Sequence, residues 1–165
     1  MPLEPKPASA SFTETVQVVL PNDANPMGFM LGGTVMHLID ITGAIAAHRH
    51  ARTPMVTAAV DGLQFLHPIH VGDLIILRAM VTAAFHTSLE VEVEVFSESL
   101  LSGDRKLTSI AYLTFATLPD DKGRRVGVAP LLSVTDDDRR RARDAAARRA
   151  VRLAAKTRTT ARDVP

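Results

Sequence analysis

The spacing of apolar residues changes along the chain, and the change separates a helical segment from several strands. Residues 33–50 are apolar around most of a helical circumference, which predicts a helix buried on nearly all sides. Beyond this segment the period shortens to two, as in strands. Strands are expected over residues 56–66, 73–85, 89–99 and 106–118. The alternation is clearest in 89–96, where valines point one way and Glu90, Glu92 and Glu94 the other, so we expect these glutamates on a wet sheet face.

The segments that precede the helix complete a fold prediction. Residues 11–20 are rich in Thr and Val and read as a strand, and residues 21–33 hold two Pro, two Asn and three Gly, which predicts a loop. Ser102, Gly103 and Asp104 predict the turn of a long hairpin between the last two strands. The order of one strand, one buried helix and four antiparallel strands indicates an α+β fold, with an antiparallel sheet wrapped around one long central helix.

The C-terminal region predicts a second helix. Thr135 followed by three Asp is a typical helix start, and we expect an Arg/Ala-rich surface helix to about Lys156, with fraying from Thr157. The predicted organisation is a flexible leader over 1–10, the α+β domain over 11–132, and a basic helix and tail over 133–165.

Composition narrows the class of protein. The chain has 165 residues, 46% of them hydrophobic, enough for one domain with a core. It has no cysteine, which excludes a disulfide framework, a thiolate nucleophile and Cys-ligated zinc. No apolar run approaches the ~20 residues of a membrane span, and residues 1–11 lack the apolar centre of a secretory signal, so we expect a cytoplasmic protein with no membrane partner. The net charge of +1 combines a body of −4 with a segment 136–165 of +5.

Asp40 is the candidate for chemistry, because a carboxylate within a buried helix is costly unless it is solvated, paired or used. Residues three or four apart share a helix face, which groups Asp40 with Gly33, His37 and Ala44 and leaves room for a ligand. The alternative is that this face is the solvent-exposed edge of the helix, with His37 and Asp40 as a weak pair.

The loop before the helix favours the chemical interpretation. Asn25 and Gly28 precede the pair Gly32–Gly33, which leads directly into the helix. First-turn N–H groups lack intrahelical partners and carry partial positive charge, so they suit a polarised carbonyl or an oxyanion. The alternative is that these glycines only serve a tight turn.

With these residues in view, the chain resembles the hotdog-fold acyl-CoA thioesterases of the brain acyl-CoA hydrolase type, which include single-domain bacterial members. The resemblance covers roughly residues 12–132. It is carried by PNDANPMGFMLGGTVMHLID (21–40), VDGLQFLHPIHVGD (60–73), HTSLEVEVEVFSE (86–98) and SGDRKLTSIAYLTF (102–115). It implies hydrolysis of acyl-CoA to a carboxylate and CoA, with no cofactor and no metal, since CoA is part of the substrate.

The resemblance also implies a shared site. Asp40 matches the family's helix acid, as general base or nucleophile, and Asn25 matches an Asn that reaches across from the partner subunit. The amide near Gly33 would polarise the carbonyl. Substrate contacts are expected at four further positions, Gly32, His37, Thr87 and Ser88. The expected assembly is a homodimer with shared sites, arranged as a trimer of dimers in a hexamer.

Some positions depart from the family pattern. Where relatives commonly carry other side chains, this chain has Ile41, Gly62, Gln64, His67 and His86. None of these replaces Asp40 or Asn25, so they bear on CoA affinity and acyl specificity rather than on the reaction class.

Other functions are less well supported by the sequence. Asp23, Asn25 and Pro26 resemble the start of a hotdog hydratase signature, but Gly28 stands where that chemistry needs a histidine. A non-catalytic acyl-CoA sensor on the same fold is the alternative from another class. The basic helix has no aromatics for stacking on bases, which argues against nucleic acid, although some of its arginines could meet CoA phosphates. His67 and His70 lack accompanying carboxylates, so a metal site is not expected there.

Overall fold

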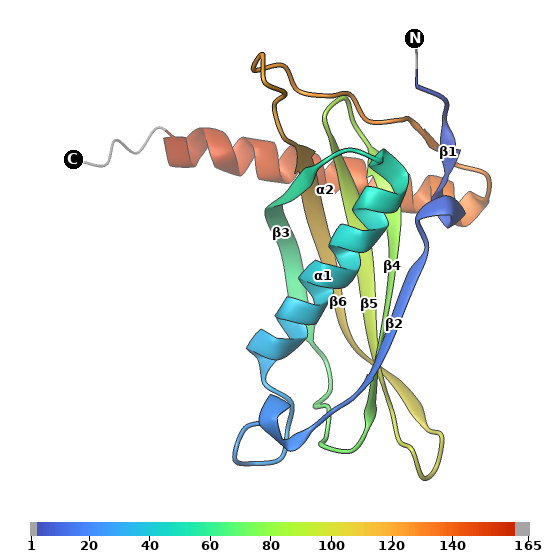
Figure 1. The fold of residues 1–165 in the computed structure, drawn as a ribbon, viewed down its shortest axis with the longest axis vertical. Coiled ribbons are helices and arrows are strands. Elements are labelled where there is room, and N and C mark those ends of the chain that lie inside the picture. Colours follow the sequence, from blue (N-terminus) through green and yellow to red (C-terminus); the bar gives the residue numbers. More distant parts are fainter. Residues whose placement is uncertain (1–2, 161–165) are drawn as a thin grey trace.

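The computed structural model describes residues 3–160 and contains two long helices and one large sheet (Figure 1). The helices are α1 (Gly32–Ala51) and α2 (Asp136–Thr160), and two short 3-10 turns are η1 (Ala8–Ser11) and η2 (Pro21–Asp23). The strands are β1 (Lys6–Pro7), β2 (Thr13–Val18), β3 (Met55–Phe65), β4 (Leu74–Ala84), β5 (Ser88–Glu98), β6 (Arg105–Thr117) and β7 (Leu131–Leu132).

Five of the strands form one antiparallel sheet in the order β2-β4-β5-β6-β3. The sequence alternation is realised in β5, whose Val91, Val93 and Val95 are fully buried on the face that carries α1. β3 and β2 are the two edges of this sheet. Register shifts in the pairing of β3 with β6 fall at Ala58 and Gly62, where bulges bend the edge strand.

The helix α1 crosses one face of the sheet and closes the core on that side (Figure 1). Val35, Leu38, Ile39 and Ala46 are buried against the sheet. Gly43 allows the close approach, because a Cβ there would lie 3.4 Å from the ring of Phe115. The expected α+β architecture, a sheet around one long helix, is therefore confirmed.

The flexible leader expected over 1–10 is wrong for residues 6–10, and Ser11, expected to begin a strand, ends η1. Strand β1 pairs in parallel with β7, and Ala8 and Ser11 of η1 are buried. The Ser11 hydroxyl donates to the Ala8 carbonyl at 2.6 Å and accepts the N–H of Val81 at 2.9 Å. These bonds satisfy buried polar groups at the edge of β4, so the segment is part of the folded domain.

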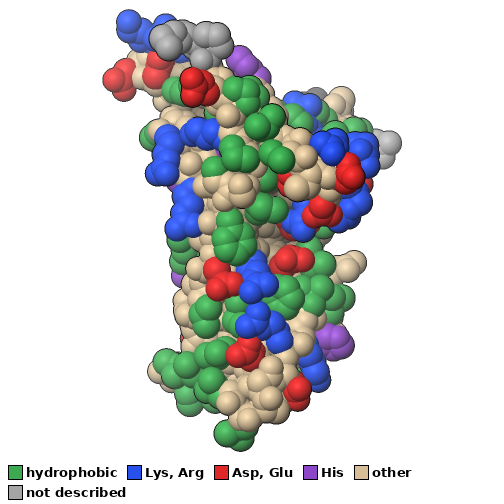
Figure 2. Space-filling model, turned by 90° about the vertical axis from the view of Figure 1, so that its right-hand side faces the viewer, with side chains coloured by type: hydrophobic (Ala, Val, Ile, Leu, Met, Phe, Trp, Pro, Cys, Tyr) green, Lys and Arg blue, Asp and Glu red, His purple; other side chains and the backbone are tan. Residues whose placement is uncertain are grey.

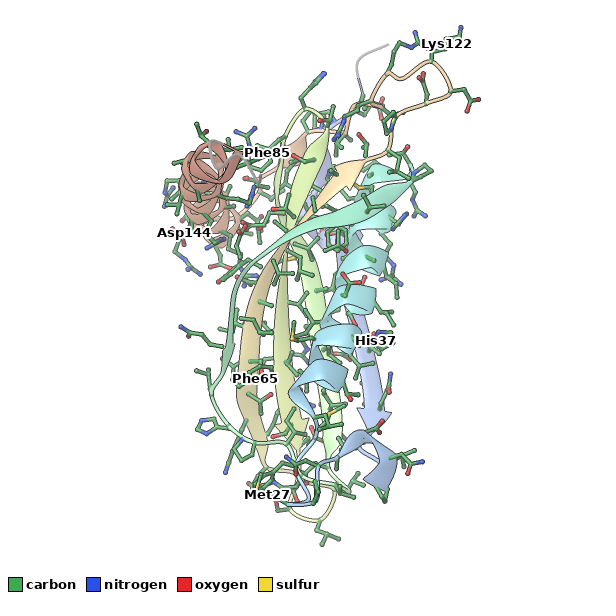
Figure 3. The ribbon with its side chains drawn as sticks, turned by 90° about the vertical axis from the view of Figure 1, so that its left-hand side faces the viewer. Met27, His37, Phe65, Phe85, Lys122 and Asp144 are labelled. Atoms are coloured by element: carbon green, nitrogen blue, oxygen red, sulfur yellow. The ribbon has the colours of Figure 1, made fainter. Side chains whose placement is uncertain are left out.

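The wet sheet face expected at the glutamates of β5 is also wrong for Glu90 and Glu92. Helix α2 lies across this face, opposite α1, near one end of the sheet (Figure 3). Glu90 is 1% exposed and forms an ion pair with Arg148 at 2.7 Å, and Glu92 pairs with Arg141 at 2.6 Å. Paired arginines neutralise carboxylates that burial would otherwise penalise. Burial nevertheless raises the pKa of the Glu92 carboxyl, against the opposing effect of Arg141.

The start of α2 is as expected, and its end is not. The Thr135 hydroxyl accepts the N–H of Asp138 at 3.0 Å, and the Asp138 carboxylate accepts the N–H of Thr135 at 2.9 Å, which is a reciprocal cap. The acidic first turn of α2 and the arginines that follow it form the mixed charged patch at the upper right of Figure 2. The helical backbone continues past Thr157 to Thr160, and the predicted tail over 161–165 lies outside the described residues.

The helix α2 attaches to the sheet through arginines and through the fully buried Ala145. Arg141 and Arg148 face the sheet, whereas Val151 is 73% exposed and Leu153 is 45% exposed. The apolar side chains in the C-terminal half of α2, Val151 and Leu153, are thus uncovered in the single chain. In the part of the chain that the structure describes, neither helix has an apolar stretch long enough to cross a bilayer.

Candidate active site

Asp40 lies midway along α1 and is half-buried. Its Oδ1 accepts a hydrogen bond of 2.6 Å from the hydroxyl of Thr57 on the edge strand β3. The carboxylate is therefore held by a neighbouring element rather than by His37. An open pocket beside it is lined by Asp40, Ile41, Ala44, Ile45, His48, Arg49 and Arg52.

Thr57 is the site residue that the sequence did not reveal. It stands 17 residues after Asp40 on a different element, so no local spacing joins the two side chains. Only the packing of α1 against β3 brings them together. The one sequence signal was its place near the start of a predicted strand, which by itself carries no chemistry.

Asn25 is held within the loop that precedes α1. Its side-chain oxygen accepts the N–H groups of Met27 at 3.0 Å and of Phe29 at 3.2 Å. Gly28 closes the turn with a φ of +82°, which a histidine would adopt only with strain. Because the oxygen is committed to the loop, the side-chain NH₂ is the group of Asn25 that can donate to a ligand.

The two glycines at the start of α1 have different surroundings. A Cβ on Gly32 would lie 3.3 Å from the ring of Phe65, so Gly32 permits close packing of the helix on β3. A Cβ on Gly33 would meet nothing within 4 Å, and Gly33 is exposed. As the second residue of α1, Gly33 has a backbone N–H without an intrahelical acceptor. Gly33 thus has an N–H without an intrahelical partner, and Gly32 has a packing role.

The expected site residues do not all meet within one chain. Asp40 lies eight residues into α1 from Gly32, about 12 Å along the helix axis at 1.5 Å per residue. His37 is exposed on the outer surface of the helix (Figure 3) and does not line the pocket beside Asp40. Thr87 lies in the turn between β4 and β5 and Ser88 begins β5, at the opposite end of the sheet from the loop that holds Asn25 (Figure 1).

Around Asp40 the surface is apolar and uncovered. Six large hydrophobic side chains on α1 and β3 are each 40–52% exposed, namely Met36, Ile41, Ile45, Val56, Val60 and Phe65. They surround an edge strand whose outer backbone groups have no partner strand. Extended apolar surface beside an open edge is typical of a protein–protein contact.

The two histidines considered for metal binding lie away from Asp40. His70 is 3.6 Å from Asp73 and both line a polar pocket with His67, at the end of the sheet that holds the loop of Asn25. Within residues 3–160 no group of three or more His, Asp or Glu side chains is arranged to hold a metal ion.

The comparison with known proteins agrees with this fold and identifies the family. The sequence profile of the thioesterase superfamily matches residues 27–103. The acyl-CoA thioester hydrolase YkhA of Bacillus subtilis is 38% identical over 120 residues, which span 73% of this chain and 69% of the relative. Some relatives are longer, and the chain spans 24% of the rat acetyl-coenzyme A thioesterase, to which it is 34% identical.

Solved structures show the same architecture. The Staphylococcus aureus acyl-CoA hydrolase, solved in complex with butyryl coenzyme A and coenzyme A, superposes with a TM-score of 0.86 at 34% identity and covers 94% of each chain. A hexameric acyl-CoA thioesterase superposes with a TM-score of 0.87 at 34% identity, covering 93% of this chain and 98% of that one. The chain belongs to the hotdog-fold acyl-CoA thioester hydrolases of the thioesterase superfamily.

Alanine variants of the S. aureus hydrolase give a further parallel. The solved variants replace an Asn, an Asp and a Thr, which are separated along that chain by 15 and 17 positions. Asn25, Asp40 and Thr57 have the same residue types at the same separations. Thr57 therefore joins Asp40 and Asn25 in the candidate site.

Proposed function

We propose that this chain hydrolyses acyl-CoA to a free carboxylate and CoA. The observation that carries the proposal is the Asp40 carboxylate, half-buried on α1 and fixed by Thr57, in a member of the acyl-CoA thioester hydrolase family. A fixed carboxylate beside an open pocket can serve a hydrolytic reaction without a metal or a cofactor.

The proposed steps of thioester hydrolysis follow from the atoms of Asp40, Gly33 and Asn25 that can still bind or react. Since Thr57 donates to Oδ1, the other oxygen of Asp40 is free to take a proton from water or to attack the thioester carbonyl. Because Gly33 and Asp40 of one helix lie about 10 Å apart, the developing oxyanion would accept the N–H of Gly33 from the positive end of α1 of a second copy. Asn25 would orient the water or the carbonyl through its NH₂ group. Collapse of the tetrahedral intermediate then expels the CoA thiolate.

Completion of the site by a second copy of the chain is part of the proposal. A two-fold axis that pairs β3 with β3 of a partner would run the two copies antiparallel and cover the apolar surface around Asp40. It would also bring the loop end of the partner toward Thr87 and the start of β5 at Ser88. The hexameric neighbours support assembly of such dimers into a trimer of dimers.

The setting that suits this reaction is the cytoplasm, with a role in lipid metabolism. Acyl-CoA is the proposed small-molecule partner, and no nucleic acid or membrane partner is invoked. A human relative that is 32% identical over 143 residues is named as a cytosolic acyl coenzyme A thioester hydrolase.

The test replaces Asp40 by Asn, which keeps the shape and removes the charge. Release of free thiol from acyl-CoAs of increasing chain length is followed with a chromogenic reagent. We expect kcat to fall about 10²–10⁴-fold, the usual contribution of a general base. The matched control is Asp121→Asn, the same change at an exposed loop residue.

The control variant should retain wild-type turnover. Unchanged activity in Asp40→Asn would contradict the assignment of Asp40. Tight binding of acyl-CoA by the wild-type protein without any turnover would favour the sensor instead.

A further inference from the structure

The C-terminal part of α2 runs beyond the edge of the sheet. Arg148 pairs with Glu90 of β5 at 2.7 Å, and four residues later Arg152 pairs with the edge strand β3 at Asp61. Eight residues follow Arg152 in the helix, which is about 12 Å at 1.5 Å per residue. Figure 1 shows this end of α2 projecting past β3. The projecting turns therefore have no strand of their own sheet beneath them.

One flank of this part of α2 carries a row of small apolar side chains. Ala147, Val151 and Ala155 are four residues apart and so share a helix face. All three line an open groove of about 600 Å³, whose floor is β3 at Val60 and Gly62. A Cβ on Gly62 would meet nothing within 4 Å, and Val151 in the middle of the row is 73% exposed. An exposed apolar row of this kind is typical of a surface that packs on a partner.

The two-fold axis proposed above fixes where a partner would lie relative to this groove. The eleven residues of β3 pair along their whole length with β3 of a second copy when the axis passes near the middle of the strand, at Val60 and Asp61. This placement sets Thr57 opposite Phe65 of the partner subunit. Since the Phe65 ring packs at the start of α1, the same placement brings that end of the partner's α1 toward Asp40.

The helix α2 crosses β3 close to this axis. Ala59 borders a pocket on one flank of α2 and Val60 borders the groove on the other, so α2 lies over the strand between them, about one and a half residues from Asp61. At about 3.3 Å per residue on either side of the axis, the two copies of α2 run antiparallel roughly 10 Å apart. Packed helices lie about 8–10 Å apart. The groove is on the flank that faces the axis.

We infer that this groove holds α2 of a second copy, so that the two C-terminal helices pack antiparallel across the sheet face opposite α1. The inference rests on the proposed function, because the shared site sets the pairing of β3. The axis passes half a strand spacing, about 2.4 Å, beyond β3. That is one to two residues along α2 from Arg152, so Val151 lies opposite Ala155 of the partner subunit.

Charge does not oppose this contact. Arg148 and Arg152 also line the groove, but each is paired with a carboxylate of its own sheet. Arg149 and Lys156 border the pocket on the opposite flank of α2. The flanks that approach each other therefore bring Ala and Val side chains together.

The first test places single cysteines on α2, since the wild-type chain has none. Val151→Cys puts a thiol on the row, and Ala146→Cys puts one at an exposed position of the same helix outside the groove. In the antiparallel contact the two copies of position 151 are offset by about 6 Å along the helices and those of position 146 by about 21 Å. A short bismaleimide is added, and covalent dimers are measured on a denaturing gel.

We expect Val151→Cys to form covalent dimers about tenfold faster or more than Ala146→Cys, because the contact holds its two thiols at a high effective concentration. Equal rates in the two variants would overturn the inference. Thiol release from acyl-CoA by wild type is measured separately. Turnover with equal cross-linking leaves the proposed function standing without the helix contact, and fast cross-linking without turnover leaves the contact standing without the function.

A second test weakens the contact with a charge. Val151→Glu and Ala146→Glu add the same carboxylate, and thermal unfolding confirms that both variants are folded. Sedimentation velocity over a dilution series measures the concentration at which assemblies dissociate to single chains. We expect this concentration to rise about tenfold or more in Val151→Glu alone, because two like charges then face each other across the contact. Equal dissociation of the two variants would also refute the helix contact.

Discussion

At the scale of single residues, the candidate site depends on a hydrogen bond between two elements. Asp40 was recognisable in the sequence because a charge inside an apolar helix stands out, but Thr57 was not, since threonine is ordinary in a strand. The contact between them fixes which carboxylate oxygen is free to react. Asp40 could thus be singled out as a candidate from the sequence, and its positioning could not.

Removal of this contact should slow the reaction without unfolding the protein. In Thr57→Val we expect kcat to fall roughly 10–100-fold, because a hydrogen bond to a charged group is worth about 1.5–3 kcal/mol. Thr57→Ser keeps the hydroxyl and should retain most of the activity. Steady-state kinetics on one acyl-CoA measures both variants. A serine variant as slow as the valine variant would show that the hydroxyl is not what matters.

His50, at the end of α1, makes the stability of the fold depend on pH. Its Nε2 donates to the carbonyl of Ala129 at 2.8 Å, and its Nδ1 is buried without a partner among the described residues. Burial lowers the pKa of His50 below its usual 6.5, the bond to Ala129 opposes this, and Lys6 adds to it. Between the lowered pKa and pH 6.5, His50 is therefore neutral in the folded state and protonated in the unfolded state.

The direction of the pH effect on the free energy of unfolding follows from the linkage between folding and proton binding. Neutral His50 makes its full contribution to the free energy of unfolding above pH 6.5. This contribution is lost as the pH falls from 6.5 toward the lowered pKa of the folded state. His50→Gln can still donate to Ala129 but does not titrate. Urea unfolding at pH 7.5 and 5.5 should show the advantage of wild type over the variant shrinking at the lower pH, by at most about 1.4 kcal/mol per pH unit. A constant difference would mean that His50 does not titrate differently on folding.

At the scale of elements, periodicity predicted helix and strand positions to within a residue or two. The helix expected over 33–50 is Gly32–Ala51, and the strand expected over 89–99 is Ser88–Glu98. What the sequence predicted wrongly is the surroundings of these elements, in particular what lies against the polar face of the sheet. Alternating glutamates indicate that one sheet face is polar, but they do not reveal whether water or a set of arginines lies against it.

The ion pair between Arg148 and Glu90 should be important for holding α2 on the sheet. Arg148 also lies 3.6 Å from the centroid of the Tyr112 ring, and Glu90 accepts the Thr82 hydroxyl at 2.7 Å. We expect Arg148→Ala to lower the free energy of unfolding by about 3 kcal/mol, since it leaves a buried carboxylate unpaired. Urea denaturation measures the change.

Two variants make this prediction specific. Arg143→Ala, at an exposed site of the same helix, should change stability by less than about 0.5 kcal/mol. Adding Glu90→Gln to Arg148→Ala removes the unpaired charge and should recover part of the loss. No recovery in the double variant would indicate that lost packing on Tyr112, rather than the charge, is responsible.

At the scale of the whole molecule, one chain holds the parts of the proposed site at separate places. Asp40 and Thr57 meet, whereas Asn25 and Gly33 lie at the start of α1 and Thr87 lies at the far end of the sheet. The exposed apolar side chains around β3 supply the surface on which a second copy would dock.

Mixed assemblies test whether subunits share sites. Co-expressed Asp40→Ala and Asn25→Ala subunits, each inactive alone, should regain activity, because every mixed dimer contains one site with both residues intact. Differently tagged subunits allow the mixed species to be purified before thiol release is measured. If a site draws Asp40 and Asn25 from the same subunit, the mixed species will stay inactive.

The sequence by itself determined the order of the main elements and the candidates Asp40 and Gly33, because periodicity and an isolated charge are local properties of the chain. The prediction that α1 is buried on nearly all sides was wrong for the single chain, since Met36, Ile41 and Ile45 are 40–47% exposed. The tertiary structure decided that residues 6–11 pack in the fold, that α2 covers Glu90 and Glu92, and that Thr57 holds Asp40. Those contacts join residues distant in sequence, and many side chains could have met there with equal local propensity. Only the packed geometry of sheet and helices selects the pairs that form.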